Sequence, residues 1–191
     1  IFEDIWIQPA SGDAGNAIGC ALAVNYLHLK KDRKIDYHDS MKGTYLGPDF
    51  SNDYIQNYLK SINSPFNYKN DDELFEQLAE FLDQGKVIGW FNGPMEFGPR
   101  ALGSRSIIGD PRNEKMQSTM NLKIKYRESF RPFAPSILEE DLQEFFDISK
   151  VKSPYMLIVA PVKKNKCLEM NETQKKLFGI DKLNQKRSVI P

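Results

Sequence analysis

The sequence predicts an α/β fold. Apolar side chains recur at helical spacing over residues 52–61 and 71–82, and a run rich in β-branched and aromatic residues, 86–91, follows directly. A helix that leads into a short strand and then into a glycine-rich loop is a common α/β arrangement. The composition is compatible with this fold, because 40% of the 191 residues are hydrophobic and 12% are aromatic, which is enough for a substantial core.

The first 30 residues predict a strand, a glycine loop and a helix. Residues 5–8 read as the end of a strand, residues 9–15 are Pro-Ala-Ser-Gly-Asp-Ala-Gly, and residues 16–30 are rich in small side chains. Small side chains on a helix predict close packing against a neighbour. Such a loop could present backbone N–H groups to a phosphate at the helix N-terminus. A tight turn followed by a buried helix is the alternative.

Two helices and a strand are expected next. Ser51 is a suitable N-cap for a helix over residues 52–61. Asp71 or Asp72 is expected to cap a second helix, which Gly85 ends. The run 86–91 that follows predicts a buried strand.

The second half of the chain continues the alternation of helices and strands. Strands are expected at 106–109 and, as a strong core strand, at 155–161. Helices are expected at 113–122 and 139–146. Residues 163–187 are polar and rich in lysine, so they predict a mobile loop that leads to a further strand.

The net charge, the cysteines and the histidines do not indicate a function for the chain as a whole. The net charge is zero, which indicates neither nucleic acid nor an acidic membrane surface as a partner. Cys20 and Cys167 lie far apart, and His28 and His38 lack a partner at metal-ligand spacing, so no disulfide framework and no metal site is expected. We expect a reducing, cytoplasmic compartment, since no apolar run could cross a membrane. The chain starts with Ile1 and ends in an apolar run, so we expect a piece of a longer protein.

Residues 89–136 are the part of the sequence that most clearly indicates a binding or catalytic site. From Glu96 to Arg131 there are eight basic and four acidic residues, a net charge of +4. Several of the cations adjoin glycine or proline, as in Gly98-Pro99-Arg100, and such residues fix the backbone or allow close approach. Guanidinium groups bind oxyanions with two directional hydrogen bonds, so the stretch predicts a phosphate or carboxylate site. A lattice of surface salt bridges is the alternative.

Two ordered motifs lie in this stretch. The first is Glu-Phe-Gly-Pro-Arg-Ala-Leu-Gly-Ser-Arg-Ser at residues 96–106, followed by Asp-Pro-Arg. The second runs from Asn121 to Ser136 and contains Arg-Glu, then Phe-Arg-Pro-Phe-Ala-Pro-Ser. Together they resemble the signature of the O-carbamoyltransferases of nodulation-factor and antibiotic biosynthesis. The loop 9–15 also matches this family, and the resemblance favours its phosphate-binding interpretation.

The resemblance implies two domains. Residues 1–43 would be the tail of an N-terminal nucleotide-binding domain of the actin-like and sugar-kinase-like type, and would contribute a strand, a loop and a helix. Gly12, Asp13 and Gly15 would lie near its nucleotide. Residues 44–191 would be a YrdC-like domain, a twisted mixed sheet with flanking helices, truncated at its C-terminus.

The resemblance also implies a reaction. The YrdC-like domain of the family is thought to form carbamoyladenylate from carbamoyl phosphate and ATP with Mg. The adenylate then moves to the N-terminal domain, where a metal helps to transfer the carbamoyl group to an acceptor hydroxyl. The family's metal-binding histidines are expected in that domain, and a His-Val-Asp-Gly-x-x-Arg segment just after Pro191. This chain alone is therefore not expected to complete the transfer.

Six residues are singled out by the resemblance and by their charge. Three of them are expected to hold carbamoyl phosphate or the adenylate phosphate as catalytic residues: Arg100, Lys125 and Arg131. Three more are expected to bind substrate or to brace the loops: Arg105, Asn121 and Arg127. Glu96 and Glu128 could pair with neighbouring arginines and fix their geometry.

Two functions of other classes remain open on the sequence alone. YrdC-like domains offer a basic concave face, so an RNA-binding module is one alternative, although aromatic residues do not alternate with the cations as stacking requires. A non-catalytic structural or dimerising domain is the other. Nucleic acid and membranes are not expected as partners, a homodimer remains open, and the sequence does not identify the acceptor.

Overall fold

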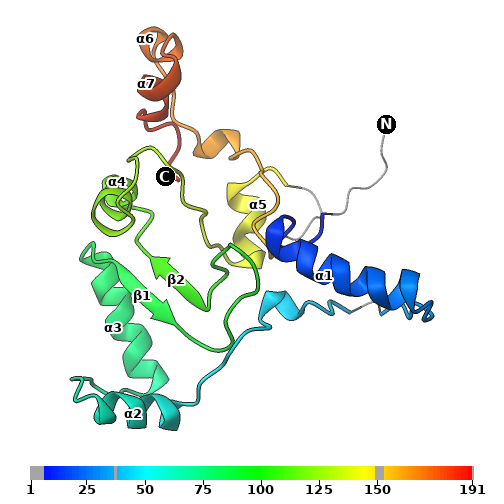
Figure 1. Ribbon diagram of the computed structural model, residues 1–191. Helices are drawn as coiled ribbons and strands as arrows, with labels where there is room; N and C mark the ends of the chain where they lie inside the picture. Colours follow the sequence, from blue (N-terminus) through cyan, green and yellow to red (C-terminus); the bar gives the residue numbers. More distant parts are fainter. Residues whose placement is uncertain (1–6, 37, 149–152, 191) are drawn as a thin grey trace. The chain divides into compact units, whose positions relative to one another are not determined.

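The computed structural model describes residues 7–36, 38–148 and 153–190, and it confirms an α/β chain (Figure 1). Two strands, β1 (Ile88–Phe91) and β2 (Arg105–Ile108), pair in a small antiparallel sheet. The α-helices are α1 (Asp13–Ala23), α2 (Asn52–Ser61), α3 (Asp71–Asp83), α4 (Met116–Thr119), α5 (Leu142–Phe145), α6 (Glu172–Lys175) and α7 (Gly179–Leu183). Short 3-10 or π-helical turns are η1 (Val24–His28), η2 (Lys42–Thr44), η3 (Met120–Ile124), η4 (Glu139–Asp141) and η5 (Lys164–Lys166).

The chain divides into two compact units, each built from separate segments. Unit 1 comprises Ile1–Tyr68, Gly89–Ser106 and Ser153–Ile158. Unit 2 comprises Lys69–Ile88, Ile107–Lys152 and Val159–Pro191. We describe each unit by itself.

Unit 1 begins with the glycine loop and α1. The helix expected over 16–30 is confirmed, but it starts three residues earlier at Asp13 and continues through η1 to His28. The strand expected at 5–8 falls partly outside the described residues, and Ile7 and Gln8 are not in a strand. Close packing of the helix is not observed, since Gly15 is the one buried residue described in α1. The other residues of α1 are exposed or half-buried in the part of the chain that the structure describes.

The helix α2 forms as the sequence predicts. Ser51 has the extended backbone of an N-cap, and its hydroxyl oxygen accepts a hydrogen bond from the N–H of Tyr54 at 3.2 Å. The Tyr54 ring stacks on that of Phe50, with ring centroids 5.3 Å apart. The contact fixes the angle at which the chain enters the helix.

The helix α3 opens unit 2, and its predicted cap was wrong by one residue. Asn70, not Asp71 or Asp72, is the N-cap, and its side-chain oxygen accepts the N–H of Glu73 at 3.0 Å. Both aspartates lie in the first turn instead, where a carboxylate interacts favourably with the helix dipole. The expected end is confirmed, because the helix stops just before Gly85, whose φ is +73°.

The strand β1 is confirmed in position but not in burial. Its residues alternate between half-buried and exposed, and Phe91 is 57% exposed. The prediction of a buried strand was wrong because β2 is the one partner of β1 in the described sheet, and a two-stranded sheet leaves much of both faces uncovered.

The best-packed part of unit 2 lies where β2 leads into α4. The helix expected over 113–122 is confirmed in part, because α4 starts at Met116 and continues as the π-helical turn η3. Met116 and Met120 are the hydrophobic side chains that are buried in the described residues. Gly109 makes room for them, since a Cβ there would lie 2.7 Å from the Met116 sulfur. This packing anchors the start of the second signature motif.

Two predictions for the last third of the chain were wrong. Residues 155–160 form no strand, and Val159 is almost fully exposed. No neighbouring strand in the described residues offers these residues a ladder of hydrogen bonds, so their apolar character alone does not make a strand. The expected loop 163–187 instead contains α6 and α7, and a capping box between Asn171 and Gln174 starts α6.

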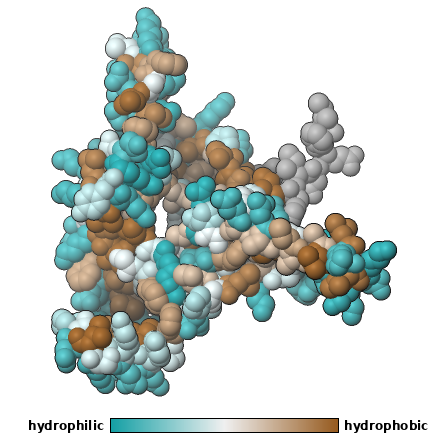
Figure 2. Space-filling model, viewed as in Figure 1, coloured by the Kyte–Doolittle hydropathy of each residue, from teal (hydrophilic) through white to brown (hydrophobic). Residues whose placement is uncertain are grey.

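The helix expected before this region agrees better with the sequence. The helix predicted for 139–146 forms as η4 followed by α5. None of the helices in the described ranges combines the length and apolar character that a membrane crossing requires. Many large apolar side chains nevertheless lie at the surface of both units, and Figure 2 shows them as brown patches.

Candidate functional site

The first signature motif forms a closed loop around one carboxylate. We call residues Glu96–Arg105 the Glu96 loop. Glu96 is 7% exposed, and its Oε1 accepts hydrogen bonds from the backbone N–H of Leu102 at 2.8 Å and Ser104 at 2.7 Å. A third N–H, of Arg105, donates to the same oxygen at 3.2 Å. The carboxylate therefore binds backbone and no arginine side chain, which differs from the pairing that the sequence suggested.

Neighbouring segments of unit 1 hold the Glu96 loop from outside. The Tyr45 hydroxyl donates to the Leu102 carbonyl at 2.6 Å, and the Phe97 N–H donates to the Thr44 carbonyl at 2.7 Å. Thr44 itself is strained, because it has a φ of +67°, which is rare for a β-branched residue. Its hydroxyl is buried without a hydrogen-bond partner among the described residues.

Gly98 brings the two glycine-containing motifs of unit 1 into contact. Its φ is +108°, and a Cβ at this position would lie 2.5 Å from the Cβ of Ala10. Only glycine fits such an approach without displacing backbone. The Glu96 loop therefore packs directly against the loop 9–15 that precedes α1.

The three residues predicted for nucleotide binding lie at the start of α1. Gly12 is the N-cap, with a φ of +145°, and makes no side-chain cap. Asp13 is exposed in the first turn, whereas Gly15 is buried against the Ala10 carbonyl, to which its N–H donates at 2.9 Å. The loop thus has the tight geometry that the sequence predicted, and its nucleotide role stays a prediction.

Arg105 is engaged by the protein itself. Its guanidinium lies 3.5 Å from the centroid of the Phe91 ring, and its Nη1 donates to the carbonyls of Asn92, Gly93 and Ser104. Both N–H groups of Nη1 thereby have acceptors, and the Phe91 ring covers one face of the guanidinium. This geometry favours the bracing role over direct phosphate binding.

Arg100 contrasts with Arg105 on the same loop. It is exposed, and no hydrogen bond, ion pair or ring contact of its side chain exists within the described part of the chain. Gly98 and Pro99 precede it, so the backbone that carries it is constrained while its guanidinium is available to a ligand.

The second signature motif, in unit 2, is organised around Asn121. This residue is fully buried. Its Nδ2 donates to the carbonyls of Ser129 at 3.1 Å and Arg131 at 2.8 Å, and its Oδ1 accepts from Nε of Arg127 at 2.6 Å. Arg127 also lies over the Phe133 ring, 4.9 Å from its centroid. Both residues therefore hold the loop together, and an Asn121 so enclosed is better suited to position neighbours than to touch substrate.

The other two cations of the motif are exposed. Lys125 follows η3 directly, and its ammonium makes no contact with the described residues. Arg131 forms an ion pair with Glu128, with its Nε 3.2 Å from Oε2, and this is the pairing that the sequence suggested for Glu128. Tyr126, between Lys125 and Arg127, is 86% exposed and has a φ of +48°.

The six residues predicted to be catalytic or to bind substrate thus lie in both units. Unit 1 brings Arg100 and Arg105 onto the Glu96 loop and places the loop 9–15 against it. Unit 2 brings Asn121, Lys125, Arg127 and Arg131 onto one segment.

One ion-pair network was not expected from the sequence. The Arg112 guanidinium donates to Asp110 and, at 2.8 Å, to Asp83 at the end of α3. Its hydrogen bonds lower the pKa of the nearly buried Asp110 carboxyl. The network ties α3 to the turn after β2, and no local pattern marks Asp83 as a partner.

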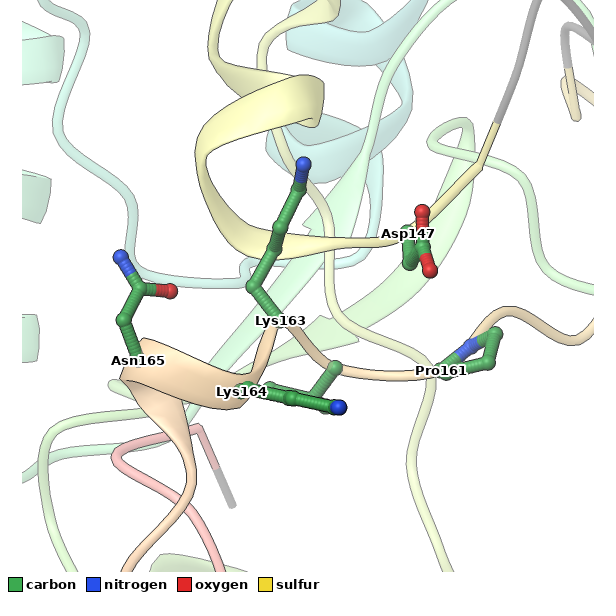
Figure 3. Close-up of a pocket in the computed structure, with 6 residues that line it drawn as sticks. Asp147, Pro161, Lys163, Lys164 and Asn165 are labelled. Atoms are coloured by element: carbon green, nitrogen blue, oxygen red, sulfur yellow. The ribbon is translucent and has the colours of Figure 1, made fainter.

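A pocket in the described residues lies elsewhere in unit 2. It measures about 470 Å³ and is lined by Asp147, Pro161, Val162, Lys163, Lys164 and Asn165. Figure 3 shows Lys163 and Lys164 pointing in different directions, so their charges do not converge on one point. The lining of this pocket contains none of the predicted site residues. No group of three or more His, Cys, Asp or Glu within metal-binding reach occurs in the residues searched.

The buried Glu96 predicts a pH dependence of stability. Burial raises its pKa, but the hydrogen bonds from backbone N–H groups outweigh this, so the pKa lies below its ordinary value of 4.5. Its contribution to stability is therefore complete above about pH 4.5 and is lost as the pH falls through the lower, folded-state pKa.

We expect Glu96→Gln to flatten this dependence. The measurement is the Tm between about pH 6 and pH 3, with the exposed Glu76→Gln on α3 as the matched control. A fall of Tm in Glu96→Gln as steep as in the unsubstituted protein would contradict the prediction.

Comparison with known proteins identifies the family. The family described as Carbamoyltransferase C-terminus matches residues 79–181, which include most of both signature motifs. The chain is 55% identical over 192 residues to an uncharacterized protein, sll1178, of Synechocystis, covering 100% of this chain and 31% of that protein. It is 41% identical over 170 residues to the nodulation protein NolNO of Sinorhizobium fredii, covering 87% of this chain and 24% of that protein.

A third relative carries the name of an O-carbamoyltransferase. The 3'-hydroxymethylcephem-O-carbamoyltransferase of Amycolatopsis lactamdurans is 30% identical over 164 residues, which cover 86% of this chain and 29% of that enzyme. The chain spans about a quarter to a third of the length of these relatives. The resemblance to O-carbamoyltransferases is confirmed, and the chain belongs to the carbamoyltransferase C-terminus family.

Proposed function

We propose that this chain is part of an ATP-dependent carbamoyltransferase, and that it binds carbamoyl phosphate and ATP to form carbamoyladenylate for transfer to an acceptor hydroxyl. The observation that supports the proposal is the exposure of two cations, one in each signature motif. Arg100 and Lys125 are exposed and free of partners in the described residues, while Arg105, Arg112 and Arg127 are engaged by the protein. A cation that the fold holds in place but leaves unpaired is available to an anionic ligand.

The roles of the cations follow from these contacts. Arg100, Lys125 and Arg131 would bind the phosphate oxygens, with Arg131 oriented by Glu128. Arg105, Asn121 and Arg127 would brace the two loops. Preorganised donors stabilise the charge that develops on phosphoryl oxygens, and do so most strongly where water is excluded.

The reaction balances with one water. Carbamoyladenylate keeps the α-phosphate of ATP and the carbamoyl group of carbamoyl phosphate. Its formation from the two substrates therefore consumes one water and releases one pyrophosphate and one phosphate. ATP supplies the leaving group, so the chain needs no nucleophilic side chain, and Mg would arrive with the ATP phosphates.

The domain assignment belongs to the same proposal. Residues 44–191 would be a YrdC-like domain, and residues 1–43 would belong to a nucleotide-binding domain of the actin-like type. The contact of Gly98 with Ala10 supports a link between the two motifs, because it places the loop of Gly12, Asp13 and Gly15 beside the Glu96 loop. Acceptor binding and the catalytic metal would lie in other parts of the full-length protein.

Calorimetric titration of the full-length protein tests the proposal. Carbamoyl phosphate is added with and without Mg-ATP at two salt concentrations, and we expect saturable binding. Arg131→Ala should weaken it about tenfold or more, whereas Lys182→Ala, an exposed lysine on α7, should leave it unchanged. Absence of saturable binding, or equal binding by Arg131→Ala, would contradict the proposal.

One observation favours a second candidate. The exposed ring of Tyr126 lies between Lys125 and Arg127 in the sequence, and an RNA-binding surface would use such a ring for stacking. RNA binding would weaken steeply with salt and would not require carbamoyl phosphate. Displacement of the RNA by carbamoyl phosphate would assign the surface to the small substrate.

A further inference from the structure

The Glu96 carboxylate is enclosed by its own loop. Its exposed fraction of 7% is far below that of most carboxylates of the chain, and three backbone N–H groups donate to its Oε1. A carboxylate with a lowered pKa and three donors is a poor proton acceptor, so a role as general base does not fit. This carboxylate joins the first residue of the loop to three of its last four residues.

Arg100 lies between the two ends that Glu96 joins. Gly98 and Pro99 precede it, and Leu102, whose N–H binds Glu96 and whose carbonyl accepts from Tyr45, follows two residues later. Among the described residues, the hydrogen bonds of this loop are therefore made on either side of Arg100, and none is made to its side chain. Loss of the carboxylate would leave three N–H groups unpaired and open the loop that carries Arg100.

Other residues of the loop cannot replace Glu96. The Arg105 guanidinium donates to carbonyls, including that of Ser104, and has no acceptor atom. The hydroxyl of the neighbouring Ser106 accepts the Gly103 N–H, at 3.1 Å. The N–H groups of Leu102 and Ser104, on the C-terminal side of Arg100, thus share a single buried side-chain acceptor.

We propose that Glu96 is a positioning residue that acts through Arg100, by holding the Glu96 loop in the form that binds the substrate phosphate. The inference rests on the proposed function. It assigns no contact between Glu96 and substrate. Binding sites are effective when supporting hydrogen bonds hold their ligating groups in place before the ligand arrives.

A double-mutant cycle in the full-length enzyme tests this role. Pyrophosphate release that depends on carbamoyl phosphate is measured for Glu96→Ala, Arg100→Ala and the double variant. Glu96→Ala should lower kcat/KM tenfold or more when Arg100 is present, and less than twofold when Arg100 is already alanine. A merely structural role predicts the same factor in both backgrounds, and that result would overturn the inference.

Glu96→Gln keeps the test valid if the alanine variant does not fold. Glutamine retains an acceptor oxygen of the same reach, so the fold should persist, with a smaller loss of activity that again vanishes in the Arg100→Ala background. Glu76→Gln on α3 serves as the control for exchange of a carboxylate for an amide. Unchanged activity of Arg100→Ala would overturn both this inference and the phosphate-binding role of Arg100. Additive losses would overturn the inference alone.

Discussion

Lys125→Ala and Arg100→Ala, each in the full-length enzyme, are expected to lower the rate of carbamoyladenylate formation by about 10²–10³-fold, which corresponds to about 3–4 kcal/mol of transition-state stabilisation. Each substitution removes a cation that has no partner among the described residues and therefore has its full charge available to the phosphate. The measurement is the release of pyrophosphate from ATP in the presence of carbamoyl phosphate.

Matched controls separate this role from general effects of charge. Lys123 lies two residues before Lys125 and is equally exposed, and Arg33 is an exposed arginine of unit 1. Alanine at either position removes the same charge and should leave the rate within about twofold, because exposed charges outside a site interact weakly through water. Rates of Lys125→Ala and Arg100→Ala equal to those of the controls would remove both residues from the proposed mechanism.

Asn121→Ala is expected to destabilise the second signature motif by about 3 kcal/mol. The substitution leaves the Ser129 carbonyl and the Arg127 Nε–H without their partner, and leaves the Arg131 carbonyl with the Gln117 amide as its one donor. Each unsatisfied buried group costs about 1–3 kcal/mol, reduced where water enters. Amide exchange reports the local change. The N–H groups of Lys125 and Arg127, which donate to Met120 and Asn121 carbonyls, should exchange about 100-fold faster.

Asn113→Ala is the matched control for this substitution. Its side chain accepts one local hydrogen bond, from the N–H of Lys115 at 3.0 Å, so its loss should cost no more than about 1 kcal/mol. An effect of Asn121→Ala on exchange no larger than that of Asn113→Ala would show that the buried network does not hold the loop.

Local sequence patterns predicted the secondary structure well where one residue type decides it. Ser51 caps α2 as expected, and Gly85 follows the end of α3, because a hydroxyl acceptor and a left-handed backbone act within one turn. The cap of α3 was misplaced by one residue, since Asn70, Asp71 and Asp72 are all suitable acceptors and only the backbone path selects among them.

Predictions that depended on which segment of the chain lies beside another were less successful. The apolar run 155–160 was expected to form a core strand, but a strand needs a neighbour to hydrogen-bond, and the described residues provide none there. The helix over 16–30 formed, yet the close packing expected from its small residues did not, because packing is decided by what lies opposite.

The sequence alone determined that the chain is α/β and that the family is that of the carbamoyltransferases, and it predicted that the two signature motifs carry the chemistry. It did so because residue order and type are enough to define a motif. It assigned different roles to the arginines of the motifs only through the family resemblance, because their side chains are chemically identical. The tertiary structure decided that Arg105 is bound by carbonyls and Phe91, that Arg100 has no partner among the described residues, and that Asn121 is buried. The physical reason is that these side chains are bound mostly by backbone carbonyl and N–H groups. Because nearly every residue carries these groups, the sequence does not show which of them the fold places beside a given arginine.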